Sequence, residues 1–197
     1  MNKILGFIGY LLLDLIETIV IAGAVFVVVY FFAFQPHEVS GESMNGKAGF
    51  HTNQYILTDK ITFKLREPER GEVIVFRYPL NPSFDYIKRI IGMPGEKIKV
   101  EKGHITIYNS ENPKGFILDE SAYLSADIFT EPNAFAVEGK EIEISQNEYF
   151  VMGDNRPKSA DSRAWGLITK GHIIGRSFFR YIPVNEMGLI KNPKYLP

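Results

Sequence analysis

The sequence has no cysteine, no long run of charges of one sign and no internal repeat. Without cysteine the chain forms no disulfide, offers no thiolate nucleophile and holds no metal through sulfur. Its 22 Lys and Arg residues nearly balance its 23 Asp and Glu residues, giving a formal net charge of −1. A near-neutral chain without a basic stripe is not expected to bind nucleic acid. The 197 residues suffice for one globular domain and an appendage.

Charge is scarce near the beginning of the chain, where residues 4–34 contain only two charged side chains, Asp14 and Glu17. The uncharged run of residues 18–35 would reach roughly 27 Å as a helix, close to the thickness of a bilayer core. A buried helix of a soluble core is the alternative, but no polar face interrupts the run. We therefore predict a single membrane span at about residues 18–35, with both acidic residues on its entry side.

A cleaved export signal is a second alternative for this segment. The run is longer than the apolar region of such a signal, and no small-x-small cleavage pattern follows it before Pro36. The sequence thus predicts a retained anchor within an N-terminal segment of residues 1–36, and Pro36 is expected to end its helix. Too few Lys and Arg residues flank the span for the positive-inside rule to orient it.

Residues 37–197 predict a mainly β domain. Short apolar stretches are separated by Gly and Pro turns, which is typical of an all-β barrel or sandwich. The predicted strands are residues 55–57, 72–76, 86–91, 97–100, 105–108, 141–144, 149–152 and 173–179. The less regular stretch 109–140 suggests a cap-like insertion between two better-defined halves, in which residues 121–129 could form a short helix.

Three polar stretches occur where a β fold does not need them. Ser43 lies in a glycine-containing loop soon after the predicted span. In the strand predicted at residues 86–91, Lys88 and Arg89 point to opposite faces, each between two apolar residues. We expect one of these cations to be buried, and only lysine readily loses its proton when desolvated; alternatively, both extend their charged ends to solvent. The third stretch, residues 152–166, would by itself indicate a solvated loop.

Together these stretches resemble the bacterial type I signal peptidases, which are serine endopeptidases of the Ser/Lys dyad class. The resemblance covers about half of the chain, residues 39–96 and 148–180, in the family's order. The matching blocks are Ser43-Met44 for the nucleophile pair, RGEVIVF at 70–76 for an Arg-Gly-Asp-hydrophobic strand, KRIIGMPGE at 88–96 for the block with the basic lysine, and GDNRPKSADSRAWG at 153–166 for the last block. The last block is the most specific of these.

The resemblance implies a role for each matching side chain. Ser43 would be the nucleophile, its backbone N–H an oxyanion donor, and Lys88 the general base. Ser159 would orient the Lys88 amine, and Asp161 and Arg163 would form a structural ion pair beneath the site. The reaction would pass through an acyl-enzyme and would need no metal or cofactor.

The resemblance also implies a substrate and a location. The substrates would be secretory preproteins with small residues at the cleavage site, and membrane lipid would surround the anchor. The enzyme would be a single-pass protein of the cell membrane, with its catalytic domain on the extracytoplasmic side.

A lysine base must be neutral at the working pH, and alternatives to Lys88 exist. Lowering a lysine pKa from about 10.4 to about 7 requires roughly 4–5 kcal/mol of preference for the neutral form. The apolar neighbours Tyr86 and Ile90 are expected to supply part of it. A rival base is Lys47, whose small and polar neighbours offer little desolvation. A Ser/His pair is the other alternative, because His37 and His51 flank Ser43 in sequence.

One departure from the family pattern affects the nucleophile turn. The family usually continues Ser-Met-x-Pro-Thr, whereas this chain reads Asn45-Gly46-Lys47 after Met44. The turn must differ, and Glu42 beside the nucleophile disfavours an oxyanion unless its carboxylate points away. Two alternative functions therefore stand beside the general peptidase: a processing protease with a narrow set of clients, and a catalytically inactive, membrane-tethered binding module.

Overall fold

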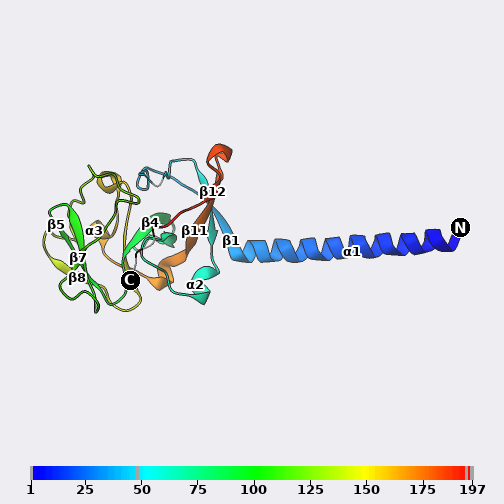
Figure 1. The fold of residues 1–197 in the computed structure, drawn as a ribbon, viewed down its shortest axis with the longest axis horizontal. Helices are drawn as coiled ribbons and strands as arrows, with labels where there is room; N and C mark the ends of the chain where they lie inside the picture. The colour runs from blue at the N-terminus through cyan, green and yellow to red at the C-terminus, as the bar shows by residue number, and fades with distance from the viewer. Residues whose placement is uncertain (1, 48, 194, 196–197) are drawn as a thin grey trace.

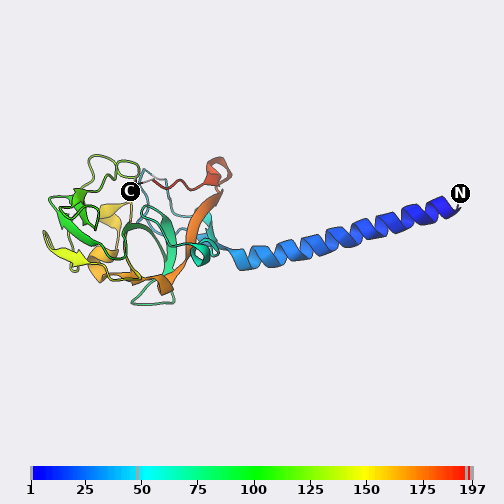
Figure 2. The same ribbon diagram turned by 60° about the horizontal axis from the view of Figure 1, so that its bottom comes forward.

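The structure, a computed structural model, describes residues 2–47, 49–193 and 195. The long helix α1 (Asn2–Ala33) extends away from a β body as a rod (Figures 1 and 2). Its stretch Gly6–Ala33 is strongly apolar, and the most apolar part of it is not covered by the rest of the described chain. At 1.5 Å per residue the helix is roughly 48 Å long. It therefore has the length and composition to cross a bilayer, and it begins well before the predicted span at residues 18–35.

The chain passes directly from α1 into the edge strand β1 (Phe34–Glu38), which pairs with β2 (Tyr55–Asp59). The helix ends before Pro36, and the proline itself lies in β1 at the edge of the sheet. An edge strand tolerates proline because its missing N–H is not needed by a neighbour. Lys60 N–H donates to Ala33 O (2.9 Å), which satisfies one carbonyl at the helix end.

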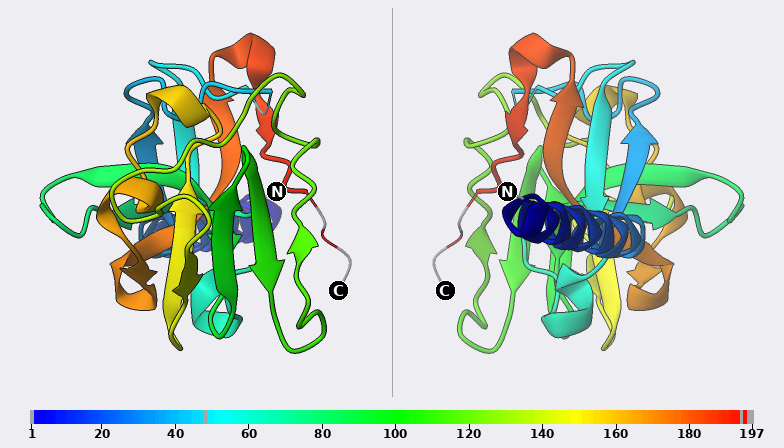
Figure 3. Two further views of the ribbon diagram at one scale, coloured as in Figure 1. Left: turned by 90° about the vertical axis from the view of Figure 1, so that its left-hand side faces the viewer. Right: turned by 90° about the vertical axis from the view of Figure 1, so that its right-hand side faces the viewer.

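Within the described residues the strands form two antiparallel sheets. The larger sheet has the order β1-β2-β11-β3-β4-β9-β10, and β12 pairs with β11; the smaller has the order β7-β6-β5-β8. Figure 3 shows the smaller sheet facing the viewer on the left and α1 nearly end-on on the right. The remaining bounds are β3 Val73–Arg77, β4 Asp85–Gly92, β5 Lys97–Glu101, β6 His104–Tyr108, β7 Phe116–Ile117, β8 Glu141–Glu143, β9 Glu148–Met152, β10 Ile168–Thr169, β11 Ile173–Ile182 and β12 Gly188–Leu189. Two short α-helices, α2 (Thr62–Leu65) and α3 (Ser162–Trp165), and three 3₁₀ turns, at Arg156–Lys158, Lys170–His172 and Val184–Glu186, complete the described elements.

The predicted mainly β fold with one N-terminal helix is confirmed, and each of the eight predicted strands is present. The prediction of a helix at residues 121–129 is wrong: this stretch consists of turns and irregular chain. Two of its side chains take part in tertiary packing instead: Tyr123 and Leu124 are buried in a core cluster with Leu118 and Ala136. The segment 109–140 thus packs onto the smaller sheet through its own core side chains.

Three buried apolar clusters hold the sheets together. One joins the smaller sheet and the segment 109–140 to the ends of β4 and β9. A second lies around the turn that carries Ser43 and contains Val39, Met44, Phe50, Ile56, Val73 and Val75. A third contains Ile74, Phe76, Ile90, Tyr149, Val151 and Ile168. The strands β4 and β9 of the larger sheet contribute side chains to both the first and the third cluster, so the core of the smaller sheet meets that of the larger sheet along these two strands.

Candidate active site

Ser43 and Lys88 meet in the structure. Ser43 lies in the turn region between β1 and β2, and Lys88 lies in β4. The Lys88 side chain is 3% exposed, and its Nζ donates to Ser43 Oγ (2.7 Å) and to Ile87 O (3.0 Å). The ring of Tyr86 lies 5.3 Å from Lys88 Nζ. The apolar strand places a lysine amine within hydrogen-bonding distance of a serine hydroxyl.

Burial perturbs the acid–base chemistry of Lys88. Desolvation lowers the pKa of Lys88 from 10.5 to about 8, while the charges of Asp161 and Asp154 act in the opposite direction. At a pKa of about 8, a useful fraction of the amine is neutral near physiological pH. A neutral amine can accept a proton from a hydroxyl, which an ammonium cannot do.

A cavity of about 420 Å³ opens beside these two side chains. Its walls are the chain segments 37–43 and 84–88, with Lys158 and Ala160 at one side and Ile56 and Val75 among the apolar lining. A larger cavity of about 790 Å³ lies elsewhere, lined by Arg66, Arg70 and Arg176, and neither Ser43 nor Lys88 lines it. The smaller cavity is therefore the one that a reacting group would enter.

A known protein family matches most of the chain. The family described as "Signal peptidase, peptidase S26" matches residues 12–182 of the chain. The chain belongs to this family. It is a serine endopeptidase of the signal peptidase I type, a hydrolase that removes signal peptides.

Named relatives of this peptidase cover most of its length. A probable signal peptidase I-2 of Synechocystis sp. is 32% identical over 183 residues, which are 90% of this chain and 77% of the relative. Signal peptidase IB of Staphylococcus aureus is 30% identical over 190 residues, which are 93% of this chain and 96% of the relative. A crystal structure of a signal peptidase I from Enterococcus faecalis V583 covers 56% of this chain and 97% of its own, with 25% identity and a TM-score of 0.43.

Asp161 and Arg163 form the expected ion pair in the peptidase. Arg163 donates to the Asp161 carboxylate through Nε (2.8 Å) and Nη2 (2.9 Å), and both side chains are almost fully buried. Asp161 also caps α3 and accepts from Gly153 N (3.1 Å). Arg163 Nη2 donates to Arg156 O (2.7 Å). The pair therefore fixes the backbone of the segment that precedes it.

Ser159 lies near Ser43, but its expected hydrogen bond to Lys88 is not formed. Its Oγ is buried and has no hydrogen-bond partner among the described residues. A Cβ placed on Gly153 would lie 2.3 Å from both Ser159 Oγ and Ser43 O. Ser159 Oγ and Ser43 O therefore both lie close to Gly153, and the Ser159 hydroxyl keeps free donor and acceptor capacity.

The rival bases make other contacts. Lys47 is exposed, and its Nζ donates to Ser121 O (2.8 Å). His37 contacts Thr58 Oγ1 (2.8 Å) and Asp85 (3.5 Å), and burial lowers the pKa of its imidazole, against the opposing charge of Asp85. His51 is exposed. Within the described part of the chain, no histidine is hydrogen-bonded to Ser43.

The turn after Ser43 approaches the segment of residues 153–156 closely. A Cβ on Gly46 would lie 3.2 Å from Asp154 Cβ, so the turn leans on the segment of residues 153–156. Glu42 does not stand alone beside the nucleophile, because its carboxylate pairs with Lys158 (2.5 Å) at the rim of the cavity. Both of these side chains are more than half exposed, so the pair contributes little stability.

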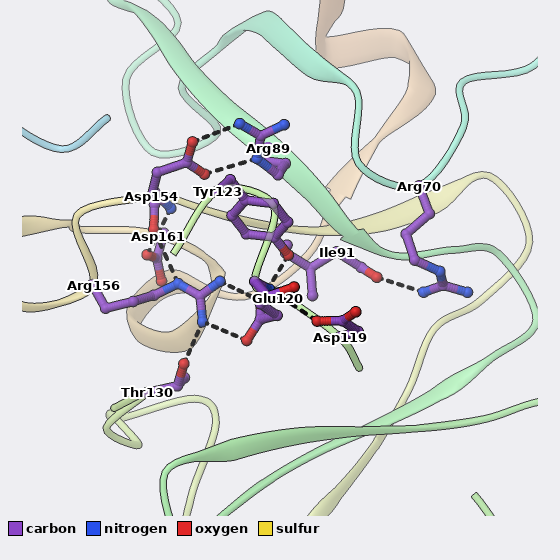
Figure 4. Close-up of polar contacts among 12 residues, drawn as sticks. Arg70, Arg89, Ile91, Asp119, Glu120, Tyr123, Thr130, Asp154, Arg156 and Asp161 are labelled. Carbon is purple, nitrogen blue, oxygen red and sulfur yellow. Dashed lines mark hydrogen bonds and ion pairs between the residues drawn. The ribbon is translucent and has the colours of Figure 1, made fainter. Parts of the chain in front are cut away.

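Sequence reasoning missed a buried network next to the site (Figure 4). Both adjacent cations of β4 are buried: Arg89, at 0% exposure, grips the Asp154 carboxylate through Nε (2.8 Å) and Nη2 (2.6 Å). The expectation that one of the two would be buried was too narrow. The carboxylate of Asp154 offsets the cost of burying the Arg89 guanidinium. This pairing is not apparent from the sequence, because the polar block that contains Asp154 has the composition of a solvated loop.

No group of three or more His, Asp or Glu side chains suited to a metal ion occurs among the residues that the structure describes.

Proposed function

We propose that this signal peptidase cleaves secretory preproteins with Ser43 as nucleophile and Lys88 as general base. The observation that carries the proposal is the 2.7 Å contact between Lys88 Nζ and Ser43 Oγ, made by a lysine that is 3% exposed. A serine hydroxyl becomes a good nucleophile only when a neighbour accepts its proton. Burial prepares the lysine for that role by favouring its neutral form.

The reaction proceeds in two halves. In acylation, the neutral Lys88 amine takes the proton of Ser43 Oγ, and Oγ attacks the carbonyl carbon of the scissile peptide. The Ser43 N–H makes no hydrogen bond within the described residues and donates to the developing oxyanion. Lys88 then passes the proton to the leaving amine, which frees the mature protein. In deacylation, Lys88 takes a proton from water and the hydroxide attacks the ester carbonyl carbon. The bond to Ser43 Oγ then breaks, Oγ takes the proton back from Lys88, and the signal peptide leaves with a new carboxyl terminus.

Ser159, Asp161 and Arg163 support the dyad in this proposal. The free hydroxyl of Ser159 orients the Lys88 amine when the amine turns toward the leaving group. Asp161 and Arg163 hold the segment that carries this hydroxyl, and their buried bidentate geometry supports that role.

The preprotein binds along the 420 Å³ cavity, which is flanked by two chain segments, 37–43 and 84–88. The limited volume and the apolar lining, which includes Ile56 and Val75, suit small residues at the cleavage site. α1 holds the catalytic domain at the bilayer, on the extracytoplasmic side, where exported signal helices end. Tethering enzyme and substrate to one surface raises the effective concentration of the substrate.

The test is cleavage of a purified preprotein by full-length enzyme in detergent or vesicles. Ser43→Ala and Lys88→Ala should each lower kcat by about 10³-fold or more while remaining folded. Lys47→Ala is the matched control for the rival base and should keep most of the activity. Full activity of Lys88→Ala, or loss of activity only in Lys47→Ala, would overturn the assignment.

A narrow set of clients is the second candidate, favoured by the altered turn and by the charged rim. Lys47 ties the turn to Ser121 O, and Glu42 and Lys158 place two charges beside Ser43. Assaying several unrelated preproteins separates the two candidates. Cleavage of one client only would support the narrow function, and comparable rates on all would exclude it.

A further inference from the structure

Two side chains from the segment 109–140 reach the arginines that support the site. This segment lies outside the sequence blocks that carry the resemblance to the family. Glu120 contacts Arg156, and the ring of Tyr123 lies 4.3 Å from the guanidinium carbon of Arg89 (Figure 4). Neither residue has a signal in the sequence, because each partner is distant along the chain and the local pattern is irregular.

Arg156 is a buried cation that depends on this segment. It is 2% exposed, and its Nη1 and Nη2 donate to the two carboxylate oxygens of Glu120, with a further hydrogen bond to Thr130 Oγ1. Its Nε donates to Gly153 O (3.1 Å). The other nearby carboxylate, Asp154, is already engaged by Arg89. Glu120 is therefore the carboxylate that directly compensates Arg156, and a buried guanidinium without such a partner is strongly disfavoured.

Arg89 is held in the same way on the other side. Its guanidinium grips Asp154, donates to Gly71 O (2.6 Å) and stacks over the Tyr123 ring. The Tyr123 hydroxyl donates to Glu120 Oε1 (2.8 Å) and accepts from Tyr195 OH (3.0 Å). A stacked aromatic ring contributes both contact area and attraction to the cation. Tyr123 and Glu120 thus join the two arginines into one network.

The network ends on the backbone that touches the nucleophile. Asn155 N donates to Ser43 O (3.0 Å), and Gly153 approaches Ser43 O so closely that a Cβ would not fit. Arg156 anchors Gly153 from one side, and Arg89, the residue next to Lys88 in β4, anchors Asp154 from the other. These contacts of Arg156 and Arg89 therefore set the position of Ser43 relative to Lys88.

We propose that Glu120 and Tyr123 are positioning residues of the active site: through Arg156 and Arg89 they hold residues 153–155 against Ser43 and keep its hydroxyl in reach of Lys88. The inference rests on the proposed function, since its first readout is Ser43-dependent cleavage. A displacement of about 1 Å in a nucleophile–base pair lowers turnover steeply, while substrate binding in the cavity is little affected.

The decisive variant is Glu120→Gln in the full-length chain, which keeps the size of the side chain and removes its charge. We expect kcat to fall about tenfold or more, with KM changed less than about twofold. Thr130→Val is the milder variant, because it removes one acceptor of Arg156 and keeps the shape. It should lower kcat less, in the same direction, and it keeps the test decisive if Glu120→Gln does not fold.

Leu118→Ala is the control for a loss of packing, since Leu118 is buried in the same segment and the same core cluster as Tyr123 but its apolar side chain makes none of the hydrogen bonds or ion pairs of the network. Assayed well below its thermal midpoint, it should keep kcat within about twofold of the wild type. Equal losses of kcat in Leu118→Ala and Glu120→Gln would show that the segment acts through stability alone and would overturn the proposal. So would a wild-type kcat in both Glu120→Gln and Thr130→Val.

Hydrogen exchange of the Asn155 amide gives a readout that does not require activity. The amide should exchange faster in Glu120→Gln than in the wild type, and at the wild-type rate in Leu118→Ala. If the wild type cleaves no preprotein but the Asn155 amide still responds to Glu120→Gln, the proposed function fails and the positioning network stands. If the wild type cleaves preproteins and neither exchange nor kcat responds, the network proposal fails and the function stands.

Discussion

At the scale of single residues, the burial of Lys88 lowers the stability of the folded protein and at the same time lowers the pKa of its amine. The fold buries a cation without a direct carboxylate partner, and the nearest acidic groups, Asp161 and Asp154, are themselves paired with arginines. Burial therefore shifts the protonation equilibrium of the lysine toward its neutral form, which is the form that the proposed general base requires. Two measurable consequences follow, one for activity and one for stability.

The activity of the enzyme should follow the titration of Lys88. The pKa of Lys88 is lowered by burial to about 8, so the amine is protonated and inactive below that pH. We expect kcat/KM to rise about tenfold per pH unit up to a pH near 8 and to level off above it. The check is a profile of kcat/KM between pH 6 and 10 on a peptide substrate without ionisable groups near the cleavage site. A flat profile across pH 7–9 would contradict the assignment of Lys88 as base.

Replacing Lys88 by an apolar side chain should raise the stability of the folded protein at neutral pH, although it removes the amine that activity requires. The folded-state pKa of Lys88 lies below its unfolded value of 10.5, so the unfolded state binds the proton more tightly. The resulting penalty is full below pH 8 and disappears as the pH rises to about 10.5. Lys88→Met should therefore raise the free energy of unfolding by roughly 3 kcal/mol at pH 7 and by little at pH 10.5. Denaturant titrations at the two pH values test this, and an equal effect at both would exclude it.

At the scale of elements, the segment from Gly153 to Ser159 packs against the turn that carries Ser43. Its approach to Ser43 is possible because residue 153 has no side chain: a Cβ there would lie 2.3 Å from Ser43 O and from Ser159 Oγ. Gly153→Ala should displace the Ser43 turn by a fraction of an ångström to an ångström. We expect kcat to fall about 100-fold, measured on a preprotein at saturating concentration.

Gly171→Ala is the control for this substitution. A Cβ at residue 171 meets its nearest neighbour, Thr169 Oγ1, at 3.7 Å, which is ordinary van der Waals contact. Activity should stay within about twofold of the wild type. Comparable activity in both variants would show that the close approach at Gly153 has no part in positioning Ser43.

The elements that could be predicted from the sequence are those determined by a pattern of neighbouring residues. Alternation of apolar residues predicted the strands, since a strand buries every second side chain whatever its partners. The partial burial of β4 was harder to predict: Lys88 and Arg89 were each seen between apolar neighbours, but the carboxylate that allows Arg89 to be buried lies 65 residues further along the chain. A local pattern does not contain such a partner.

The structure of the segment 109–140 likewise depends on contacts with residues that are distant in the sequence. Residues 121–129 were predicted as a possible short helix, but Tyr123 and Leu124 are buried in a cluster with side chains of both sheets, and this tertiary packing determines the backbone. Glu120 carried no signal at all, because its role depends on Arg156, 36 residues away. The residues of the dyad could be proposed from sequence by resemblance, whereas the network around them required the structure.

At the scale of the whole molecule, the protein consists of a helical rod joined to a β body. α1 passes through β1 into the sheet (Figure 1), and its most apolar stretch lies uncovered by the described chain. The three buried clusters are built from residues after the helix. The cores that position Ser43 and Lys88 are therefore complete without the rod, and its contribution must concern where the reaction takes place.

A variant lacking residues 2–31 should separate folding and chemistry from location. We expect it to keep the thermal midpoint of the β body and to cleave a soluble peptide with a kcat within a few-fold of the full chain, because none of the three clusters loses a side chain. On a preprotein inserted in vesicles, it should be at least about tenfold slower at equal enzyme concentration, since it loses the gain from confinement to one surface. Replacing α1 by an unrelated apolar helix of the same length should restore the rate on vesicles. If the unrelated helix failed to do so while the peptide activity persisted, α1 would have to recognise the substrate or a partner rather than simply anchor the enzyme.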